Sequence, residues 1–387
     1  MRILYFSSSP VPSQAANSVQ VVKMCAAFVR AGHEVRLFCR QNGPAAPDRA
    51  TLQRVYGITE AIALTTLTQP RLRLLGRALY ARRAARHAQA HVSKADLVYG
   101  RDIYSLLRAR RWGLPIVYEA HMPPANRVKR RMHHLLFSHP SFRRLVTVSH
   151  RLAEYYRSTF PELRAAEILA APNGADDPRD AATSPDAAAS ANRLQSSHPD
   201  LHRRLRSVGY VGSPAAHKGI ELVIDLARAL PELDFHLVGG SEQTLADLRR
   251  SAPANLRLHG HLSQDRLNEI YPSFKVVLAP YRRAPGPRLT DDTEWGSPLK
   301  IFEYMAHGCC IVASDLPVIR ELVGDGEAAV LCPPEDLEAW RHALGALLND
   351  PDRRRLLAEV ARRRFAERYT RSARAQTVLA GLTPHSD

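Results

Sequence analysis

Short apolar runs separated by amphipathic segments recur along the whole chain. The first instance is an apolar run at 3–6, a helical apolar periodicity over 19–29 and a second apolar run at 34–39. Short continuous apolar runs are typical of strands that are buried on both faces of a parallel sheet. Gly32 stands where a helix is expected to stop in the left-handed conformation. The pattern therefore predicts a strand–helix–strand unit of the doubly wound type.

The same alternation continues through both halves of the chain. In the first half it predicts further strands at 97–99, 116–118 and 145–148. In the second half it predicts a helix at 220–230 and strands at 208–211, 235–238, 256–259, 276–280, 310–313 and 329–331. The tail from 337 to 382 has a helical pattern that Asp350-Pro351 interrupts once. We therefore expect an α/β fold with two Rossmann-like domains.

The segment between the two series has a different composition from either. Residues 177–206 are rich in Pro, Asp, Ala and Ser and poor in large apolar side chains, which is typical of a solvated linker. We place an N-terminal domain at 1–176, a hinge at 177–206 and a C-terminal domain at 207–364. Because such sheets bind ligands at the carboxyl ends of their strands, the expected site is a cleft that both domains face.

Composition narrows the class of protein. At 387 residues and 45% apolar, the chain can form two cores and is too apolar to be disordered. Its five cysteines show no metal-ligand spacing, and an odd count argues against a disulfide framework, so we expect no structural zinc and a reducing compartment. The first apolar run is too short for a signal peptide, and no stretch approaches the roughly 20 apolar residues of a membrane span. These features predict a cytoplasmic protein.

The net charge of +16 is distributed unevenly. Residues 1–176 hold 27 Lys+Arg and 10 Asp+Glu, whereas residues 177–387 hold 27 and 28. The segments 71–86 and 127–137 mix Arg with apolar residues at near-helical spacing. They suit either an anionic membrane surface, which would make the protein peripheral at the inner face, or a plain solvated Arg-rich face. No nucleic-acid partner is expected, because helix-turn-helix, RNP and Cys/His-finger motifs are missing.

The most informative motif predicts a helix over 298–307. Ser297 suits its N-cap, Pro298 its first position, and Gly308 its end. From Ser297 to Leu299, the start of such a helix offers backbone N–H groups and a positive dipole end, which together bind phosphate.

Two charged residues follow on one face of that helix. Lys300 and Glu303 are three positions apart, and Glu303 is placed to accept hydrogen bonds from the two hydroxyls of a ribose. The alternative interpretation is an ordinary surface Lys/Glu pair.

Other candidate polar residues follow predicted strands. Lys218-Gly219 comes after the strand at 208–211, where a compact cation could hold a diphosphate, although a solvated loop lysine would give the same pattern. Glu119-Ala-His121 follows the strand at 116–118, and Arg101-Asp102 the strand at 97–99. A lone histidine is more often structural than catalytic, but two polar pairs at the ends of strands strengthen the case for a cleft role.

Taken in order, these motifs resemble the GT4 family of retaining glycosyltransferases (glycosyl transferases group 1). The resemblance runs from about 1 to 380. It is carried by Gly32-His-Glu-Val35, Glu119-Ala-His121, Thr147-Val-Ser149, Pro172-Asn-Gly-Ala-Asp176, Lys218-Gly219, Phe302-Glu-Tyr-Met-Ala306 with Gly308, and Ile311-Val-Ala-Ser-Asp315.

The resemblance implies a GT-B fold with a metal-independent transferase site and no cofactor. A nucleotide-diphosphate sugar would bind the second domain through Lys218 and the start of the 298–307 helix. A sugar, glycan or lipid-linked acceptor would meet the first domain, with His121 orienting the sugar or polarising the acceptor and Asn173 near the cleft. A terminal helix at about 365–387 would return to the first domain. Such enzymes assemble glycans, polysaccharides and glycolipids.

Two positions depart from the family pattern. Ser213 stands where the family usually has an arginine that contacts phosphate, so Lys300 is a candidate replacement. The first of two family glutamates, usually eight residues before Glu303, is replaced by Trp295, with Glu294 one place out of register. A GT-B sugar-nucleotide epimerase is the alternative enzyme, although it would need carboxylates in the cleft for proton abstraction. A basic surface-binding or nucleic-acid-binding protein is the remaining alternative.

Overall fold

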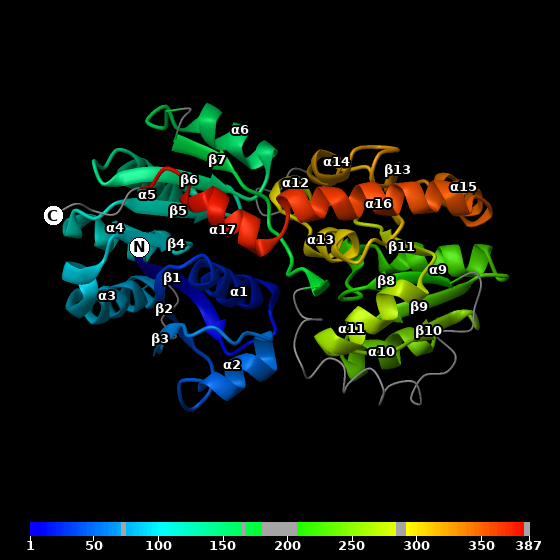
Figure 1. Ribbon diagram of the computed structural model, residues 1–387, viewed down its shortest axis with the longest axis horizontal. Coiled ribbons are helices and arrows are strands. Elements are labelled where there is room, and N and C mark those ends of the chain that lie inside the picture. The colour runs from blue at the N-terminus through cyan, green and yellow to red at the C-terminus, as the bar shows by residue number, and fades with distance from the viewer. Residues whose placement is uncertain (71–74, 165–166, 180–206, 284–291, 383–387) are drawn as a thin grey trace. The chain divides into compact units, whose positions relative to one another are not determined.

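A computed structural model describes residues 1–70, 75–164, 167–179, 207–283 and 292–382. The chain divides into two compact units (Figure 1). Unit 1 comprises Met1–Pro172 and Arg371–Asp387, and unit 2 comprises Asn173–Thr370. The first part of unit 1 thus ends at 172, where 176 was expected, and its C-terminal part begins at 371, where about 365 was expected. Most of the expected linker, 180–206, lies outside the described residues.

Unit 1 contains a seven-stranded sheet in the order β3-β2-β1-β4-β5-β6-β7. All neighbouring strands are parallel, with Arg2 opposite Glu34 between β1 and β2. The strands are β1 Arg2–Val11, β2 Glu34–Gln41, β3 Ala63–Leu67, β4 Leu97–Gly100, β5 Ile116–Ala120, β6 Phe142–Thr147 and β7 Ile168–Ala170. The sequence pattern predicts five of these; β3 and β7 have mostly half-buried side chains and lie at the sheet edges, so they lack the continuous apolar signal.

Helices cover both faces of this sheet. They are α1 Ala16–Arg30, α2 Arg49–Tyr56, α3 Gly76–Ala88, α4 Ile103–Ala109, α5 Arg127–Phe137, α6 His150–Thr159 and α17 Arg371–Leu379. One core joins α1, α2 and α17 to alternate residues of the central strands, including Tyr5, Tyr99 and Val117. The C-terminal helix α17 therefore completes the core of unit 1 although it follows unit 2 in the sequence.

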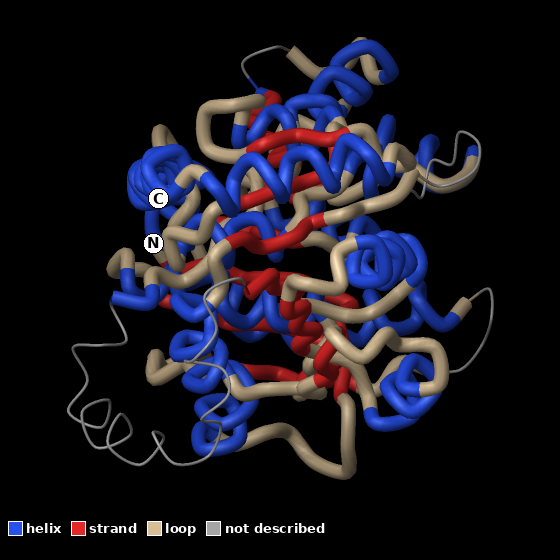
Figure 2. Tube along the Cα trace, turned by 90° about the vertical axis from the view of Figure 1, so that its right-hand side faces the viewer, coloured by secondary structure: helices blue, strands red, loops and turns tan. Residues whose placement is uncertain are grey.

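Unit 2 contains a six-stranded parallel sheet in the order β10-β9-β8-β11-β12-β13. Its strands are β8 Ser207–Val211, β9 Asp234–Val238, β10 Leu256–Leu258, β11 Val276–Ala279, β12 Ile311–Ser314 and β13 Val330–Cys332. Its α-helices are α9 Ile220–Ala229, α10 Glu242–Arg249, α11 Gln264–Ile270, α12 Asp292–Trp295, α13 Leu299–Ala306, α14 Pro317–Val323, α15 Leu337–Asn349 and α16 Pro351–Arg368. Figure 2 shows strands flanked by helices in both units. Both units are thus Rossmann-like, as the hydrophobic pattern predicts.

The five cysteines, all within the described part of the chain, are buried free thiols. Their side chains are part of the apolar cores of the two units; Cys25 of α1 and Cys39 of β2, for example, belong to the same core of unit 1. Burial raises the pKa of the Cys39 and Cys310 thiols to about 12, which keeps both protonated at neutral pH.

Candidate active site

The carboxyl edge of the unit 2 sheet gathers the predicted donor-binding residues. β8 lies between β9 and β11. Strands β9 and β10 are added on one side of β8 and strands β11 to β13 on the other, so the strand order reverses at β8. Such a reversal point is where open α/β sheets bind ligands. Lys218 lies in the short 3-10 helix η4, Ala216–Lys218, after β8, and Lys300 lies in the first turn of α13.

The connection from β8 to α9 depends on a glycine. Gly219 has φ +78°, and a Cβ at this position would lie 1.5 Å from the carbonyl oxygen of Pro280. Only glycine fits such a left-handed, close approach. The loop thereby comes against the end of β11, and Lys218 Nζ lies 4.8 Å from the centre of the Tyr281 ring.

Lys300 is a buried lysine, not the surface lysine of the alternative interpretation. Its exposure is 7%, and Nζ lies 3.6 Å from the centre of the Tyr210 ring and 5.2 Å from that of Tyr281. A Cβ on Gly212 would lie 3.4 Å from Nζ, so the ammonium group is close to the backbone after β8. Among the residues that the structure describes, none accepts a hydrogen bond from Lys300 Nζ.

The two lysines make this edge strongly electropositive. Burial and the charge of Lys218 hold the pKa of Lys300 well below its usual range, although Glu303 opposes them. Both ammonium groups lie near Tyr281, whose ring face attracts cations but supplies no negative charge. A phosphate or diphosphate would supply that charge and accept the hydrogen bonds that Lys300 lacks.

The prediction that Ser297 caps the 298–307 helix is wrong. The helix α13 begins at Leu299, and Pro298 is its N-cap residue. Ser297 Oγ instead accepts a hydrogen bond from the backbone N–H of Asn173 at 2.9 Å, which leaves it unable to turn towards the helix. Asn173 is buried and its side chain also donates to the Ser297 carbonyl at 3.4 Å. Gly308, with φ +61°, follows the helix as expected.

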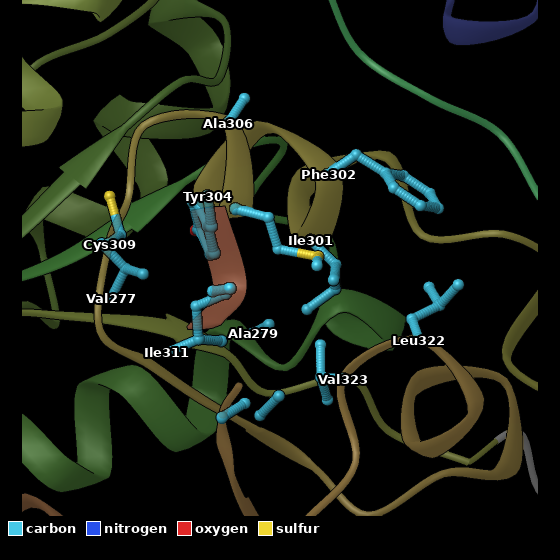
Figure 3. Close-up of a cluster of buried hydrophobic side chains, with 14 of the residues drawn as sticks. Val277, Ala279, Ile301, Phe302, Tyr304, Ala306, Cys309, Ile311, Leu322 and Val323 are labelled. Carbon is cyan, nitrogen blue, oxygen red and sulfur yellow. The ribbon is translucent and has the colours of Figure 1, made fainter. Parts of the chain in front are cut away.

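Tyr304 of α13 lies in a buried cluster with Val277 and Ala279 of β11 (Figure 3). β8 and β11 pair only from Val208 to Gly209, so the two strands separate beyond that point. The Tyr304 hydroxyl bridges the separated strands: it accepts from the Val211 N–H at 2.9 Å and can donate to the Leu278 carbonyl, which is 3.1 Å away. Because Lys300 is one helical turn before Tyr304, this anchor also places Lys300 at the reversal point.

Glu303 lies on the half-buried side of the same helix. Tyr271 donates a hydrogen bond to Glu303 Oε2 at 3.3 Å. Tyr271 is in turn stacked on His307, with ring centres 4.1 Å apart, and His307 Nε2 is 3.0 Å from Asn268 Oδ1. These contacts orient the Glu303 carboxylate, whose negative charge acts on Lys300 of the same helix.

Unit 1 has its own polar cluster at the carboxyl ends of β4 and β5. Glu119 is 1% exposed and accepts hydrogen bonds from the Tyr99 hydroxyl and, at 3.1 Å, from Arg374 of α17. His121 Nε2 lies 2.6 Å from Glu119 Oε1, and Arg101 Nε lies 3.9 Å from the same oxygen. Two-residue alternation along the strand puts Glu119 and His121 on one face, which explains why the predicted pair meets.

The cations decide the ionisation of this cluster. Burial alone would raise the pKa of Glu119, but the charge of Arg374, the hydrogen bond from His121 and the charge of Arg101 hold it well below its usual range. Desolvation and the charge of Arg101 lower the pKa of His121 to about 4. At neutral pH the pair is therefore a carboxylate and a neutral imidazole.

The remaining predicted site residues lie around these two clusters. Ser213 is exposed and its carbonyl accepts from the Tyr210 hydroxyl at 2.7 Å. Glu294 is half-buried in α12. The aromatic residues Tyr210, Tyr281 and Tyr304 are functional neighbours that sequence reasoning missed, although Tyr304 stands inside the quoted Phe302–Ala306 motif. Arg374 had no local signal, because its partner Glu119 is 255 positions away.

Two further observations concern metals and membranes. Across the described ranges, no group of three or more His, Cys, Asp or Glu side chains is arranged to hold a metal ion. In the same part of the chain, every helix is too short or too polar to cross a membrane.

Comparison with known families covers most of the chain. Residues 18–179 match the family described as Glycosyltransferase Family 4, and residues 206–350 match Glycosyl transferases group 1. The chain belongs to the GT4 family of glycosyltransferases. Within the family it is 28% identical over 182 residues to an alpha-D-kanosaminyltransferase of Streptomyces kanamyceticus, which covers 45% of this chain and 44% of that protein.

A second relative is a phosphatidyl-myo-inositol mannosyltransferase of Mycolicibacterium smegmatis. It is 26% identical over 162 residues, which is 41% of this chain and 39% of the relative. The matched segments thus span less than half of either curated relative. The solved structure of Anabaena Alr3699/HepE in complex with UDP matches 98% of both chains, with 17% identity and a TM-score of 0.68. This likeness confirms the expected GT-B fold.

Proposed function

We propose that the protein transfers a sugar from a nucleotide-diphosphate donor to a hydroxyl acceptor. The observation that carries this proposal is the ammonium group of Lys300, which is buried among aromatic rings with no described hydrogen-bond acceptor beside a second lysine. A buried charge without a partner is costly and is stabilised when an anionic ligand binds. The family supplies the reaction class, and the lysine pair supplies the place for the diphosphate.

Different residues of unit 2 bind different parts of the donor. Lys218 and Lys300 bind the diphosphate, and Lys300 takes the place of the arginine that the family has at position 213. Glu303, oriented by Tyr271, accepts hydrogen bonds from the ribose hydroxyls. The backbone from Ser297 to Leu299 adds the positive end of α13.

We propose that transfer retains the configuration of the anomeric carbon. The bond from that carbon to the diphosphate oxygen breaks, the acceptor oxygen bonds to the same face, and the acceptor proton passes to the departing diphosphate oxygen. The lysine pair stabilises the charge that develops on that oxygen, which is the largest demand on the site. His121, neutral with one ring nitrogen on Glu119, orients the sugar or polarises the acceptor hydroxyl. Lysines meet the charge demand without a metal ion, so we expect transfer to persist in EDTA.

The first experiment measures donor binding. Purified protein is titrated with UDP-, GDP-, ADP- and CMP-sugars in EDTA by thermal shift and calorimetry, and one nucleotide class should raise the melting temperature. Lys218→Ala and Glu303→Ala should each lose that shift, whereas Lys275→Ala, an exposed lysine of the same unit, should keep it. Binding that is unchanged in both site variants contradicts the donor assignment.

The second experiment identifies the reaction. The protein is incubated with its donor and a panel of sugar and lipid acceptors, and the product is analysed by NMR. A product with the donor's anomeric configuration supports retaining transfer, and inversion contradicts it. An epimerised nucleotide sugar formed without acceptor would show the alternative enzyme class.

We also propose that unit 1 meets its acceptor at an anionic membrane surface. Four large apolar side chains are largely exposed among the described residues, and three of them, Leu75, Val128 and Leu135, lie in the two Arg-rich segments. α3 and α5, which carry most of these segments, both pack against α4. Exposed apolar side chains among cations match the chemistry of an acidic headgroup layer.

Vesicle co-sedimentation tests this surface. Vesicles with 30% phosphatidylglycerol should retain the protein at low salt better than pure phosphatidylcholine vesicles, and about 0.5 M salt should release it. Val128→Asp should weaken retention, whereas Leu356→Asp, at a comparably exposed site in α16, should not. Equal retention by both kinds of vesicle contradicts the proposal.

A further inference from the structure

Glu119 connects the C-terminal helix of unit 1 to His121. One carboxylate oxygen, Oε2, accepts from Tyr99 and from Arg374 Nη1, and the other, Oε1, faces His121 Nε2 at 2.6 Å. Both Glu119 and Arg374 are almost completely buried, at 1% and 2% exposure. The imidazole of His121 keeps a side-chain exposure of 23%. A single buried carboxylate thus joins a residue of α17 to an accessible ring.

Arg374 is held from a second direction by the chain itself. Its Nε donates to the carbonyl oxygens of Ala171 at 3.2 Å and Pro172 at 3.0 Å, the last residues of unit 1 before the chain leaves it. The guanidinium group is therefore locked in one orientation towards Glu119. A planar fork of donors suits this double role, and the single ammonium group of lysine does not.

The contact between Glu119 and His121 selects the tautomer of the imidazole. Because Glu119 is a carboxylate, its Oε1 can only accept, so His121 Nε2 must carry a hydrogen and donate the hydrogen bond. The proton of the neutral ring then resides on Nε2, and Nδ1 is left as an acceptor. An acceptor hydroxyl could donate to Nδ1, which is the role that the proposed function gives this ring.

We propose that Arg374 is a positioning residue for His121: by holding Glu119 in place and ionised, it fixes the tautomer and the neutral state of the imidazole. The proposal rests on the proposed function for the role of His121 in transfer, but the coupling of the two residues can be measured without any substrate. A residue of the C-terminal helix thereby contributes to the chemistry of the acceptor site.

The direction of the effect follows from the surrounding charges. The groups that face the Glu119–His121 pair are Tyr5 of β1, Cys25 of α1, Tyr99 and Arg101 of β4 and the loop after it, and Arg374 of α17. The tyrosines and the cysteine are neutral, so the positive charges of Arg101 and Arg374 oppose a further proton on the pair. Removing Arg374 must therefore raise the pH at which the pair takes up that proton.

The test is an NMR titration of the His121 ring in the full-length protein. In the wild type, the ring should carry its proton on Nε2 and titrate near pH 4. In Arg374→Gln the pKa of His121 should rise by about one pH unit or more, and in Arg374→Lys, which keeps the charge, it should stay near the wild-type value. Arg144→Gln is the matched control, since Arg144 holds α17 through the carbonyls of Val378 and Ala380 without contacting Glu119. It should leave the titration unchanged.

Several outcomes would overturn the proposal. An Nδ1–H tautomer or an ordinary pKa for His121 in the wild type would do so without any variant, even where Arg374→Gln fails to fold. An unchanged titration in folded Arg374→Gln would do the same.

Turnover measures the role of the coupling in transfer. With the donor found by the binding screen, Arg374→Gln should lower kcat about tenfold at pH 7, move the acid limb of the pH profile upward and leave donor affinity in unit 2 unchanged. A moved pKa with unchanged kcat would contradict positioning. Full activity in His121→Ala would contradict the proposed role of His121 and leave the titration result standing.

Discussion

Each unit buries a charged side chain at its candidate site. The negative charge in unit 1 has hydrogen-bond partners, whereas the positive charge in unit 2 has no described acceptor. In unit 1 the Glu119 carboxylate is surrounded by Arg374, Tyr99 and His121, so its hydrogen bonds are made within the unit. In unit 2 the Lys300 ammonium lies against aromatic rings, and no described residue accepts a hydrogen bond from it. A charge whose partners come from its own fold stabilises that fold, whereas a charge without them is available to a ligand. The comparison separates a positioning network from a binding group.

The largest effect is expected at the satisfied charge. Glu119→Gln leaves Arg374 buried without its carboxylate, which should cost about 3–5 kcal/mol of unfolding free energy. Urea denaturation measures it, with the exposed Glu154→Gln as a control that should change stability by about 0.5 kcal/mol or less. If Glu119→Gln unfolds at the wild-type urea concentration, the network of unit 1 is not a stabilising one.

Acid should weaken unit 1 next. Because the pKa of His121 is about 4 in the fold against an ordinary 6.5, the unfolded chain takes up a proton first as the pH falls. His121 thus contributes stability that is complete above pH 6.5, is lost as the pH falls towards 4 and amounts to at most about 3 kcal/mol. Buried His133, whose pKa is also lowered to about 4, adds a similar slope.

Urea denaturation between pH 7 and pH 4 measures these slopes. His121→Gln should remove its share of the loss and keep that of His133. A His121→Gln protein that loses as much stability in acid as the wild type would show that His121 titrates normally.

Lys300→Met should give two effects of opposite sign. Removing a buried ammonium group that has no described hydrogen-bond acceptor should raise the unfolding free energy by about 1–3 kcal/mol. The same change should weaken donor binding about 100-fold, because the diphosphate loses a buried cation. Denaturation of the free protein and calorimetry with the donor measure the two effects. A destabilised Lys300→Met protein with normal donor affinity would reverse the comparison.

The last prediction compares two neutral hydroxyl groups of unit 2, of which Tyr271 should give the smallest effect. Tyr304→Phe removes the hydroxyl that accepts from the Val211 N–H between β8 and β11, which should cost about 1–3 kcal/mol. Tyr271→Phe, which loses one hydrogen bond of 3.3 Å to Glu303, should cost about 1 kcal/mol or less. Melting temperatures of the two variants give the ranking, and a larger loss in Tyr271→Phe would contradict Tyr304 as the anchor of α13.

Periodicity and motifs predict much of this molecule because both act over short distances. Apolar runs mark the central strands, and Glu119-Ala-His121 meets on one face because alternation along a strand is fixed. The edge strands β3 and β7 are not predicted, because half-buried strands mix polar and apolar residues and lack a continuous apolar run. The prediction of a Ser297 cap is wrong because the Ser297 hydroxyl accepts a hydrogen bond from the backbone of Asn173, which is far away in the sequence. Nothing near position 300 in the sequence indicates that Tyr210 and Tyr281 surround that lysine; only the three-dimensional fold brings them together.

The order of elements along the chain bears on how the protein is made. A ribosome releases all seven strands of unit 1 and then the whole of unit 2 before α17 appears. Before that helix is made, the Glu119 carboxylate lacks its ion-pair partner Arg374. The core of unit 1 also lacks the apolar side chains of Ala375, Val378 and Leu379. Unit 2 is contiguous from Asn173 to Thr370, so its core needs no later element, whereas the core of unit 1 is completed only when α17 has been made.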